Sequence, residues 1–475
     1  MLFPTATFAL FFLAVLPVSW LLMPRQRLWF PFIVFASYVF YGWWNWHYVF
    51  LLVASTLVNW VLGLAIDRRD DMRARKGLLW CAIVFNLGLL GYFKYSGFFL
   101  SSTRNSLNDA GLDVALPVVT ALLPIGISFY TFMALSYVID IYRGKLRPTT
   151  LPKFAAFLSF FPHLVAGPIV RGSELIPQLD SPRDPRRIDA TRAFFLIASG
   201  LFMKVVIASY LGTEIVDKVF AAPEQYSSVD VLVGIYGYAV QIFADFLGYT
   251  NIAIGLALLL GFEFPTNFNA PYAATSVRDF WRRWHMTLSR WLRDYLYIPL
   301  GGNRHGRLAT YRNLMIVMLL GGLWHGAAWT FVVWGGIHGL GLCVEHGWAE
   351  FRAWRGLPER PDTPAKRMWR RLITFNFVCF GWVFFRADSF STAADVLKQL
   401  FSGIHTPVQA VSLPVLLAIA VGIGAQYVPG RVWDALMALF SRRALVLQGA
   451  ALAVALLVIN VLGPEGVAPF IYFRF

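Results

Sequence analysis

Charged residues are scarce in this sequence of 475 residues. Asp, Glu, Lys and Arg together make up 14% of the chain, whereas 58% of it is hydrophobic and 17% is aromatic. Soluble domains carry about 25% charged residues, so this composition argues against a soluble protein and is typical of an integral membrane protein. Acidic residues are the scarcer kind, with 26 Asp and Glu against 41 Lys and Arg.

Cysteine pairs, nucleotide-binding loops and internal repeats are also missing from the sequence. The three cysteines, Cys81, Cys343 and Cys379, lie in apolar stretches at unrelated spacings, which excludes a disulfide framework and gives no support for a metal site. No G-x-x-x-x-G-K-S/T phosphate loop is present, so an ATP-driven pump is not expected. Because neither a repeat nor a change of composition divides the chain, we predict a single membrane domain over residues 1–475.

Apolar runs long enough to cross a membrane recur along the chain. A helix needs about 20 apolar residues to span ~30 Å of hydrocarbon. The run at 313–344 is rich in glycine and is expected to hold two packed or broken segments, whereas the run at 154–170, with Pro162 and Pro168, is expected to be re-entrant. Together the runs predict an all-α, multi-pass membrane protein with about 11–12 segments. Apart from 154–170, they lie at 5–23, 28–46, 48–66, 77–100, 116–142, 191–211, 229–261, 313–344, 372–385, 412–427 and 444–462.

Arginine and lysine gather in alternate loops. Cytoplasmic loops collect basic residues, so we place the basic set on the cytoplasmic side and the N-terminus outside. The formal charge of +15 is then explained by anchors next to anionic lipid, and the expected partner is the lipid bilayer rather than nucleic acid. The basic clusters lie at 24–27, 67–76, 142–148, 183–189, 278–312, 365–371 and 441–443, and the loops poor in Arg or nearly neutral lie at 101–113, 212–230 and 387–403.

The segment at about 276–298 has the pattern of an amphipathic helix. At about 100° per residue, its apolar side chains share one arc of roughly 120°, with the arginines on the other side. We therefore predict a continuous helix at the cytoplasmic interface, and its histidine, His285, points inward with the apolar residues. The inward set is Trp281, Trp284, His285, Leu288, Trp291, Leu292 and Tyr295, and the opposite set is Arg282, Arg283, Arg290, Arg293 and Asp294.

A second histidine, His325, lies within the apolar run "LLGGLWHGAAWTF". No charged residue occurs between Arg312 and Glu345. A polar group at membrane depth usually faces a bundle interior or a water-filled path, and a histidine that only bonds a neighbouring helix is the structural alternative. Imidazole suits general base work near neutral pH, and burial keeps it uncharged. Two inward histidines favour a reaction chamber, while His338, thirteen residues further on, is expected to pack.

Three long motifs carry a resemblance to a known family. They are "LLPIGISFYTFMALSYVIDIYRG" (122–144), "DFWRRWHMTLSRWLRDYLYIPLGGNRHG" (279–306) and "LLGGLWHGAAWTFVVWGGIHG" (319–339), with further similarity at 160–171 and 468–475. In these motifs the chain resembles the membrane-bound O-acyltransferases (MBOAT), in the bacterial branch that contains the membrane subunit of alginate O-acetyltransferase.

The resemblance implies a fold and two catalytic residues. The fold is a bundle of helices around a tunnel that is narrowest near the deep histidine, in a multi-pass protein of the bacterial inner membrane. His325 matches the family's catalytic histidine in its Trp-His-Gly setting, and His285 matches the second motif histidine, on the cytoplasmic approach. The family's asparagine alternative at that second position is absent here.

The chemistry expected of the resemblance is acyl transfer without a bound cofactor. The donor is acetyl-CoA or a carrier-protein thioester, and a thioester is already activated, so no metal is needed to deprotonate and align the acceptor hydroxyl. Because no Gly-x-Ser-x-Gly elbow accompanies His325, direct transfer is preferred to an acyl-enzyme. Four aromatic residues are expected to wall the tunnel and exclude water, namely Trp281, Tyr295, Trp324 and Trp329.

The expected function is O-acetylation of an extracytoplasmic polysaccharide, alginate or a similar exopolysaccharide. Peptidoglycan O-acetylation and D-alanyl transfer to teichoic acid are the alternatives within the family, and a transporter or a non-catalytic export subunit would belong to other classes. The outer loops are short and offer no platform for a glycan. We therefore expect a periplasmic acetyltransferase partner, with its own serine nucleophile, that receives the group or completes the transfer.

Overall fold

A computed structural model describes the chain at residues 1–112, 114, 117, 122–357, 362–443, 445–463 and 470–471. Every regular element over these residues is a helix, which confirms the all-α class. The chain divides into two compact units, one of Met1–Ala190 with Ala253–Pro265 and one of Thr191–Ile252 with Thr266–Phe475. The single domain expected over residues 1–475 stays a prediction.

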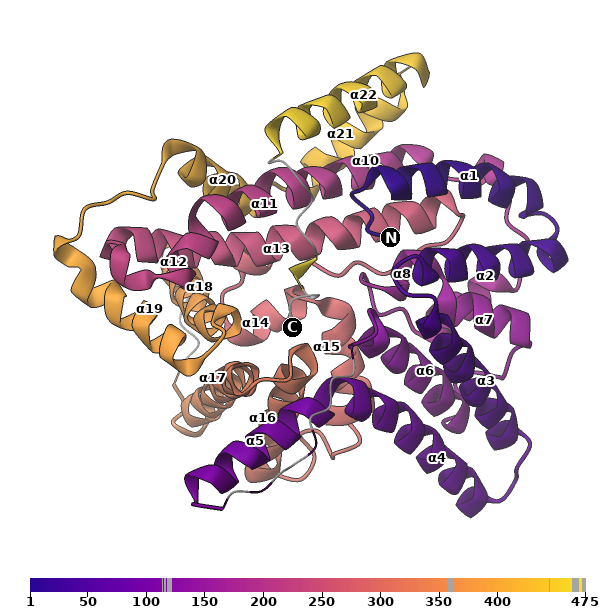
Figure 1. Ribbon diagram of the computed structural model, residues 1–475, viewed down its shortest axis with the longest axis horizontal. Coiled ribbons are helices and arrows are strands. Elements are labelled where there is room, and N and C mark those ends of the chain that lie inside the picture. Colours follow the sequence, from indigo (N-terminus) through magenta and orange to yellow (C-terminus); the bar gives the residue numbers. More distant parts are fainter. Residues whose placement is uncertain are drawn as a thin grey trace. The chain divides into compact units, whose positions relative to one another are not determined.

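The first unit is built from helices that pack in pairs. Helices α1 and α2 lie side by side, and α3, α4 and α6 pack against one another (Figure 1). Between α3 and α4 the buried amides of Asn59 and Asn86 each donate to the other's oxygen, at 3.2 and 2.7 Å, so these polar groups are satisfied inside apolar helices. The helices are α1 (Ala6–Leu22), α2 (Gln26–Gly42), α3 (His47–Asp67), α4 (Met72–Leu90) with its π-helical continuation (Gly91–Tyr95), α5 (Ser96–Asp109), α6 (Ile127–Tyr142), α7 (Leu151–Ser159), α8 (Phe161–Leu164) and α9 (Gly172–Leu175).

The run expected to be re-entrant consists of the two short helices α7 and α8 followed by irregular chain. His163 in α8 is fully buried, and its Nε2–H donates to the carbonyl oxygen of Phe157 at 2.9 Å. Its ring stacks on Phe264, with centroids 5.1 Å apart. His163 is therefore a packing residue of this unit, and re-entrance into the membrane remains a prediction.

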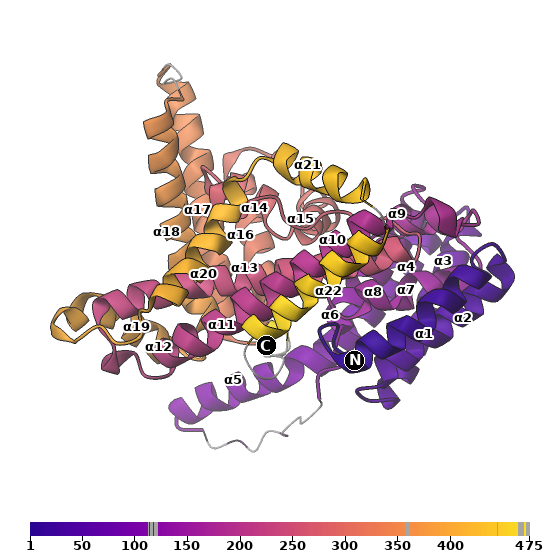
Figure 2. The ribbon, with the colours of Figure 1, turned by 90° about the horizontal axis from the view of Figure 1, so that it is seen from above.

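The second unit holds both histidines singled out above. Figure 2 shows α17 and α18 rising side by side, and α16 packs along α17. Its helices are α10 (Ala190–Leu201), the π-helix Phe202–Ala208, α11 (Ser209–Leu211), α12 (Asp217–Ala221), α13 (Ser228–Leu259, with its last turns in the first unit), α14 (Val277–Arg283), α15 (Met286–Leu292), the π-helix Arg293–Tyr297, α16 (Arg307–His325), α17 (Trp329–Trp354), α18 (Pro364–Arg386), α19 (Phe390–Ser402), α20 (Leu413–Gly424), α21 (Gly430–Ser441) and α22 (Leu445–Leu462).

The apolar run at 313–344 is two packed segments, as its glycines indicated. It breaks after His325 into α16 and α17. Glycines permit the close approach, since a Cβ on Gly322 would lie 2.2 Å from the carbonyl oxygen of Phe331, and one on Gly335 would lie 2.2 Å from that of Met318. Small residues at such contacts are typical of helices packed in membranes.

Several helices are suited to a bilayer. Within the described residues, four helices are long and apolar enough to cross a membrane, or up to five if the bent pair Leu413–Tyr427 and Gly430–Ser441 is one span. Shorter apolar helices include Ala6–Leu22 and Ile127–Tyr142, which fall below the about 20 residues of a straight span. The membrane class is supported, and the number of about 11–12 segments stays a prediction.

Candidate active site

His285 lies at a break between two short helices. The expectation of one continuous amphipathic helix over 276–298 is wrong, because α14 ends at Arg283 and α15 begins at Met286, with His285 in the left-handed region at φ 41°. Tertiary hydrogen bonds replace the helical ones here. The N–H of Met286 donates to the carbonyl oxygen of Asn267, and the N–H of Asn269 donates to that of Arg283, both at 2.9 Å.

The inward face predicted for this segment is nevertheless observed. Trp284, His285, Leu288 and Trp291 are all buried, with His285 at 0% exposure. Most of the arginines assigned to the opposite face are exposed or partly exposed. The alternation of apolar and charged residues therefore decided which side chains enter the interior, even though the backbone is not one helix.

The hydrogen bonds of Asn267 fix the tautomer of His285. The side-chain oxygen of Asn267 accepts from the N–H of Thr287 at 3.2 Å and from its hydroxyl at 2.9 Å, and it lies 3.1 Å from Nδ1 of His285. An oxygen with these donors accepts from Nδ1–H as well, which leaves the lone pair of the neutral ring on Nε2. This Nε2 is buried without a hydrogen-bond partner among the described residues, and burial lowers the pKa of His285 to about 3.

His325 ends α16 and is 3% exposed. Its ring centroid lies 6.5 Å from that of His285, so the two predicted catalytic residues are brought into one site. Edge-to-face contacts hold the imidazole between Trp324 at 5.0 Å, Trp334 at 5.1 Å and Phe385 at 5.3 Å. Rings on several sides orient His325 and exclude water from it.

A cavity of about 570 Å³ leads to His325 within the second unit. Its lining includes the buried residues His325 and Trp334 and exposed arginines such as Arg278 and Arg282, whereas His285 lies outside the lining. The lining consists of Arg278, Trp281, Arg282, Met286, Leu288, Ser289, Arg290, Leu292, Arg293, Tyr297, Asn303, Thr310, Leu314, Val317, Met318, Gly321, His325, Trp334, Leu342 and His346.

The four aromatic residues expected to wall a tunnel take different positions. Trp281 lines the cavity, whereas Trp324 lies outside the lining and packs against both His325 and His285. Tyr295 is buried against Trp291, with centroids 5.1 Å apart, and does not line the cavity. Trp329 begins α17 with 52% of its surface exposed and lies outside the lining, because the chain leaves His325 in an extended conformation through Gly326 and Ala328.

Sequence reasoning missed two neighbours of the histidines, Trp334 and Asn267, whereas His338 packs as expected. Trp334 lies on α17 against His325, and its indole N–H is buried without a partner among the described residues, as is that of Trp281. Asn267 holds His285 from a segment eighteen positions upstream. His338 is fully buried and contacts Trp281 at 5.2 Å and Trp334 at 5.0 Å. The four-residue step from Trp334 to His338 was a usable signal, because both share one face of a helix.

The fold and the site together define a class of protein. An all-helical protein with membrane-length helices, and with two buried histidines side by side next to a cavity lined with arginines, fits a membrane-embedded transferase or transporter. Comparison with known families decides between these. The family model of MBOAT, the membrane-bound O-acyltransferases, matches residues 118–386, and the chain belongs to this acyltransferase family.

Relatives of known name cover most of the chain. It is 41% identical over 376 residues to the probable alginate O-acetylase AlgI of Pseudomonas aeruginosa, covering 78% of this chain and 69% of that protein. It is 37% identical over 430 residues to the peptidoglycan O-acetyltransferase of Helicobacter pylori, covering 82% and 78%. The teichoic acid D-alanyltransferase of Streptococcus thermophilus is 29% identical over 284 residues, covering 55% and 68%. The resemblance seen in the motifs is confirmed.

Proposed function

We propose that this protein moves an acetyl group from a cytoplasmic thioester to a hydroxyl on the outer side of the bacterial inner membrane. The observation that carries the proposal is the pairing of His325 and His285, 6.5 Å apart, next to a cavity that reaches His325. Family membership supports acyl transfer. Relatives named as alginate O-acetylases support an acetyl group and an exopolysaccharide such as alginate.

The cavity suits a donor with phosphate groups. Four arginines line it, and the guanidinium of Arg293 pairs with the carboxylate of Asp294 at 2.7 Å. The four are Arg278, Arg282, Arg290 and Arg293. Arginines bind phosphates through several N–H donors. Acetyl-CoA, or the phosphopantetheine arm of a carrier protein, would place its phosphates among these arginines and its thioester near His325.

The transfer is a direct reaction in this proposal. His325 takes the proton of the acceptor hydroxyl while the hydroxyl oxygen bonds to the thioester carbonyl carbon. Collapse of the tetrahedral intermediate breaks the C–S bond, and the leaving thiolate takes the proton from the imidazolium of His325. The buried indole N–H groups of Trp281 and Trp334 line the cavity and are the donors we assign to the carbonyl oxygen.

His285 acts as a positioning residue in this scheme. Its Nδ1–H is held by Asn267, so Nε2 presents a fixed lone pair. The low pKa, about 3, keeps the ring neutral at physiological pH. His285 lies beside His325 and outside the cavity lining. We assign its Nε2 the task of accepting a hydrogen bond once the donor is bound, which holds the thioester in line with the attacking hydroxyl.

A periplasmic partner completes the proposed route. The relatives bearing acetylase names differ in the polymer that each name states, alginate or peptidoglycan, although they share the membrane domain matched here. We propose that a periplasmic acetyltransferase with a serine nucleophile takes the acyl group and selects the polysaccharide. Peptidoglycan and, with an alanyl donor, teichoic acid are the alternative acceptors.

The test is transfer across a membrane by the purified chain. Proteoliposomes receive labelled acetyl-CoA on the side of the arginine-rich segment, and the label is measured on polymer or partner protein on the other side. We expect transfer by wild type and a rate about 10²–10⁴-fold lower for His325→Ala. Equal transfer by both proteins contradicts the proposal, and accumulation of intact thioester across the membrane indicates a transporter. Transfer to polymer without a partner shows that no relay is needed.

Orientation has its own measurement. If the segment 278–312 is cytoplasmic, a cysteine introduced by Arg304→Cys resists membrane-impermeant thiol reagents in intact cells and reacts after the cells are opened. Efficient labelling from the periplasmic side would reverse the proposed direction of transfer.

A further inference from the structure

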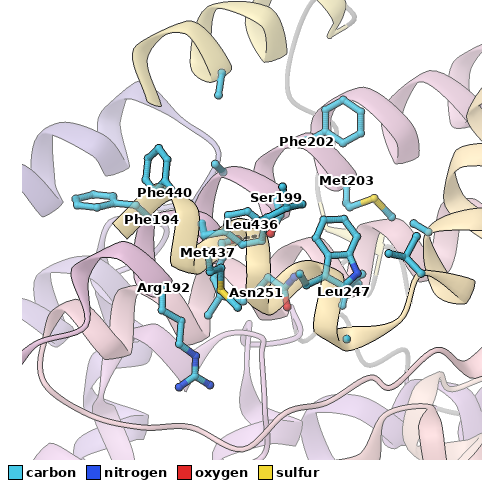
Figure 3. Close-up of a pocket in the computed structure, with 18 of the residues that line it drawn as sticks. Arg192, Phe194, Ser199, Phe202, Met203, Leu247, Asn251, Leu436, Met437 and Phe440 are labelled. Carbon is cyan, nitrogen blue, oxygen red and sulfur yellow. Dashed lines mark hydrogen bonds between the residues drawn. The ribbon is translucent and has the colours of Figure 1, made fainter. Parts of the chain in front are cut away.

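A second and larger cavity lies elsewhere in the second unit. It measures about 1060 Å³ and is bounded by α10 with its π-helical continuation, by α13, and by α21 and α22 (Figure 3). Its lining shares no residue with that of the cavity at His325. The proposed acyl transfer therefore makes no use of it.

Helix α21 turns one apolar stripe toward this cavity. Trp433, Leu436, Met437 and Phe440 follow the i, i+3, i+4, i+7 spacing of one helix face, and all four line the cavity. Arg431 lies outside the lining. The helix is bent by 94° from the apolar helix before it, as expected of an interfacial helix that follows a membrane span. Its apolar face thus contacts the cavity, and the matching ligand is apolar.

Two arginines stand at one end of the cavity. Figure 3 shows Arg192 at the same end as Phe194 and Phe440, with Phe202 and Met203 toward the other end. Arg443 follows Phe440 by three residues and also belongs to the lining. Two hydrogen bonds of Gln448 connect the segment of Arg192 with that of Arg443. The Thr191 hydroxyl donates to the side-chain oxygen of Gln448 at 3.4 Å, and the side-chain NH₂ of Gln448 donates to the carbonyl oxygen of Arg443 at 2.9 Å.

The lining is positively charged. The described residues that line the cavity include Arg192 and Arg443 and no Asp or Glu. Juxtaposed arginines at a membrane interface attract anionic lipid headgroups. A ligand that satisfies both ends has a negative headgroup and a long apolar tail.

An amide lies on the wall between the two ends. Asn251 of α13 lines the cavity beside Leu247 (Figure 3). Its NH₂ donates and its oxygen accepts hydrogen bonds, and an ester carbonyl of a glycerolipid would accept from the NH₂. From one end of the cavity to the other, the lining therefore presents the arginines, then the amide of Asn251, then apolar side chains.

We propose that this cavity binds one acidic glycerophospholipid of the surrounding bilayer. The phosphate lies against Arg192 and Arg443, an ester carbonyl accepts from Asn251, and an acyl chain runs along the stripe of α21 toward Phe202 and Met203. The order of charge, hydrogen-bonding group and hydrocarbon in such a lipid is the order found in the lining. The site does not depend on the acyl-transfer proposal.

Photolabelling of the full chain in nanodiscs tests the site. The probes are phosphatidylglycerol and phosphatidylcholine that carry the same diazirine in one acyl chain, each at the same concentration. Each arginine contributes about fivefold, so we expect phosphatidylglycerol to label peptides from α10, α21 and α22 about 25-fold more than phosphatidylcholine. Arg192→Gln combined with Arg443→Gln should remove this preference. Arg431→Gln, on the other face of α21, should keep it.

A cavity-filling pair separates this site from the general lipid surface. Ala455 lines the cavity, whereas Ala453 of the same helix is exposed and does not. Ala455→Phe should abolish labelling of these peptides by phosphatidylglycerol, and Ala453→Phe should leave it unchanged. Equal labelling by the two lipids in wild type, which needs no variant to fold, overturns the proposal. Labelling that persists in Ala455→Phe, or that falls only on peptides outside the lining, also overturns it.

Discussion

Asn267 offers the sharpest test of how this fold prepares a histidine for chemistry. Three groups donate to the side-chain oxygen of Asn267, namely the Nδ1–H of His285 at 3.1 Å and the N–H and hydroxyl of Thr287 at 3.2 and 2.9 Å. Asn267→Leu removes this shared acceptor. All three residues are at most 1% exposed, so water does not replace the lost acceptor. An orphaned buried donor costs about 1–3 kcal/mol, so three of them predict a loss of roughly 3–9 kcal/mol in the free energy of unfolding and a lower melting temperature in detergent. Asn105→Leu, at an exposed position of α5, is the control.

Asn267→Asp separates the chemistry from the stability. The carboxylate still accepts all three hydrogen bonds, but its negative charge favours imidazolium and raises the pKa of His285 from about 3 by about 1–3 units. Below this pKa the Nε2 lone pair is lost, so the acid limb of acyl transfer moves to higher pH while the rate near pH 8 is retained. The assay is the initial rate of transfer in proteoliposomes between pH 4 and 8. An acid limb that coincides with wild type, or an Asn267→Leu protein with wild-type stability, refutes this account of the site.

Three further perturbations address the remaining parts of the molecule. His325→Ala should lower acetyl transfer by about 10²–10⁴-fold, measured as label released from product by mild base, whereas His285→Ala should retain measurable activity; equal residual rates would contradict the separate roles. Trp334→Phe keeps the ring but loses the indole N–H, and should lower kcat by about 10²–10³-fold with little change in melting temperature; an unchanged kcat excludes it as a donor. Lys204 and Asp245 form a buried ion pair, so Lys204→Met should destabilise the chain by about 3–5 kcal/mol in a detergent unfolding assay. Adding Asp245→Leu should recover much of this lost stability. If it recovers none, the unpaired carboxylate is not the cause of the loss.

Much of the architecture could be predicted from the sequence, because a membrane imposes simple rules on composition. Long apolar runs with few charges predict helices, since backbone groups in hydrocarbon must bond within their own segment. The glycines of residues 313–344 indicated two packed segments, and the structure has them as α16 and α17. The inward direction of His285 also followed from periodicity, because it depends on neighbouring side chains alone.

The break at His285 could not be predicted from local pattern. A continuous helix satisfies the apolar periodicity of 276–298 equally well. The left-handed conformation at His285 is accompanied by tertiary hydrogen bonds, in which the Asn267 carbonyl accepts from the N–H of Met286 and the N–H of Asn269 donates to the Arg283 carbonyl. Such a strained residue is retained where surrounding contacts determine it. The sequence does not reveal that a segment nearly twenty positions upstream supplies those contacts.

His325 also has some properties that the sequence predicts and others that only tertiary contacts decide. Its depth in an apolar run and its chemistry were properties of the sequence by itself. The contact of Trp334 with His325 and the position of Trp329 outside the cavity depend on the extended turn after His325, which brings α17 back along α16. Phe385 reaches the same histidine from α18. The membrane class, the helical runs and the inward faces were determined by the sequence. They depend on the composition and periodicity of each segment, which decide whether its side chains are more stable in hydrocarbon or in water. The site and the cavities were decided by tertiary structure, because contacts between distant segments place side chains to within the few ångströms that chemistry requires.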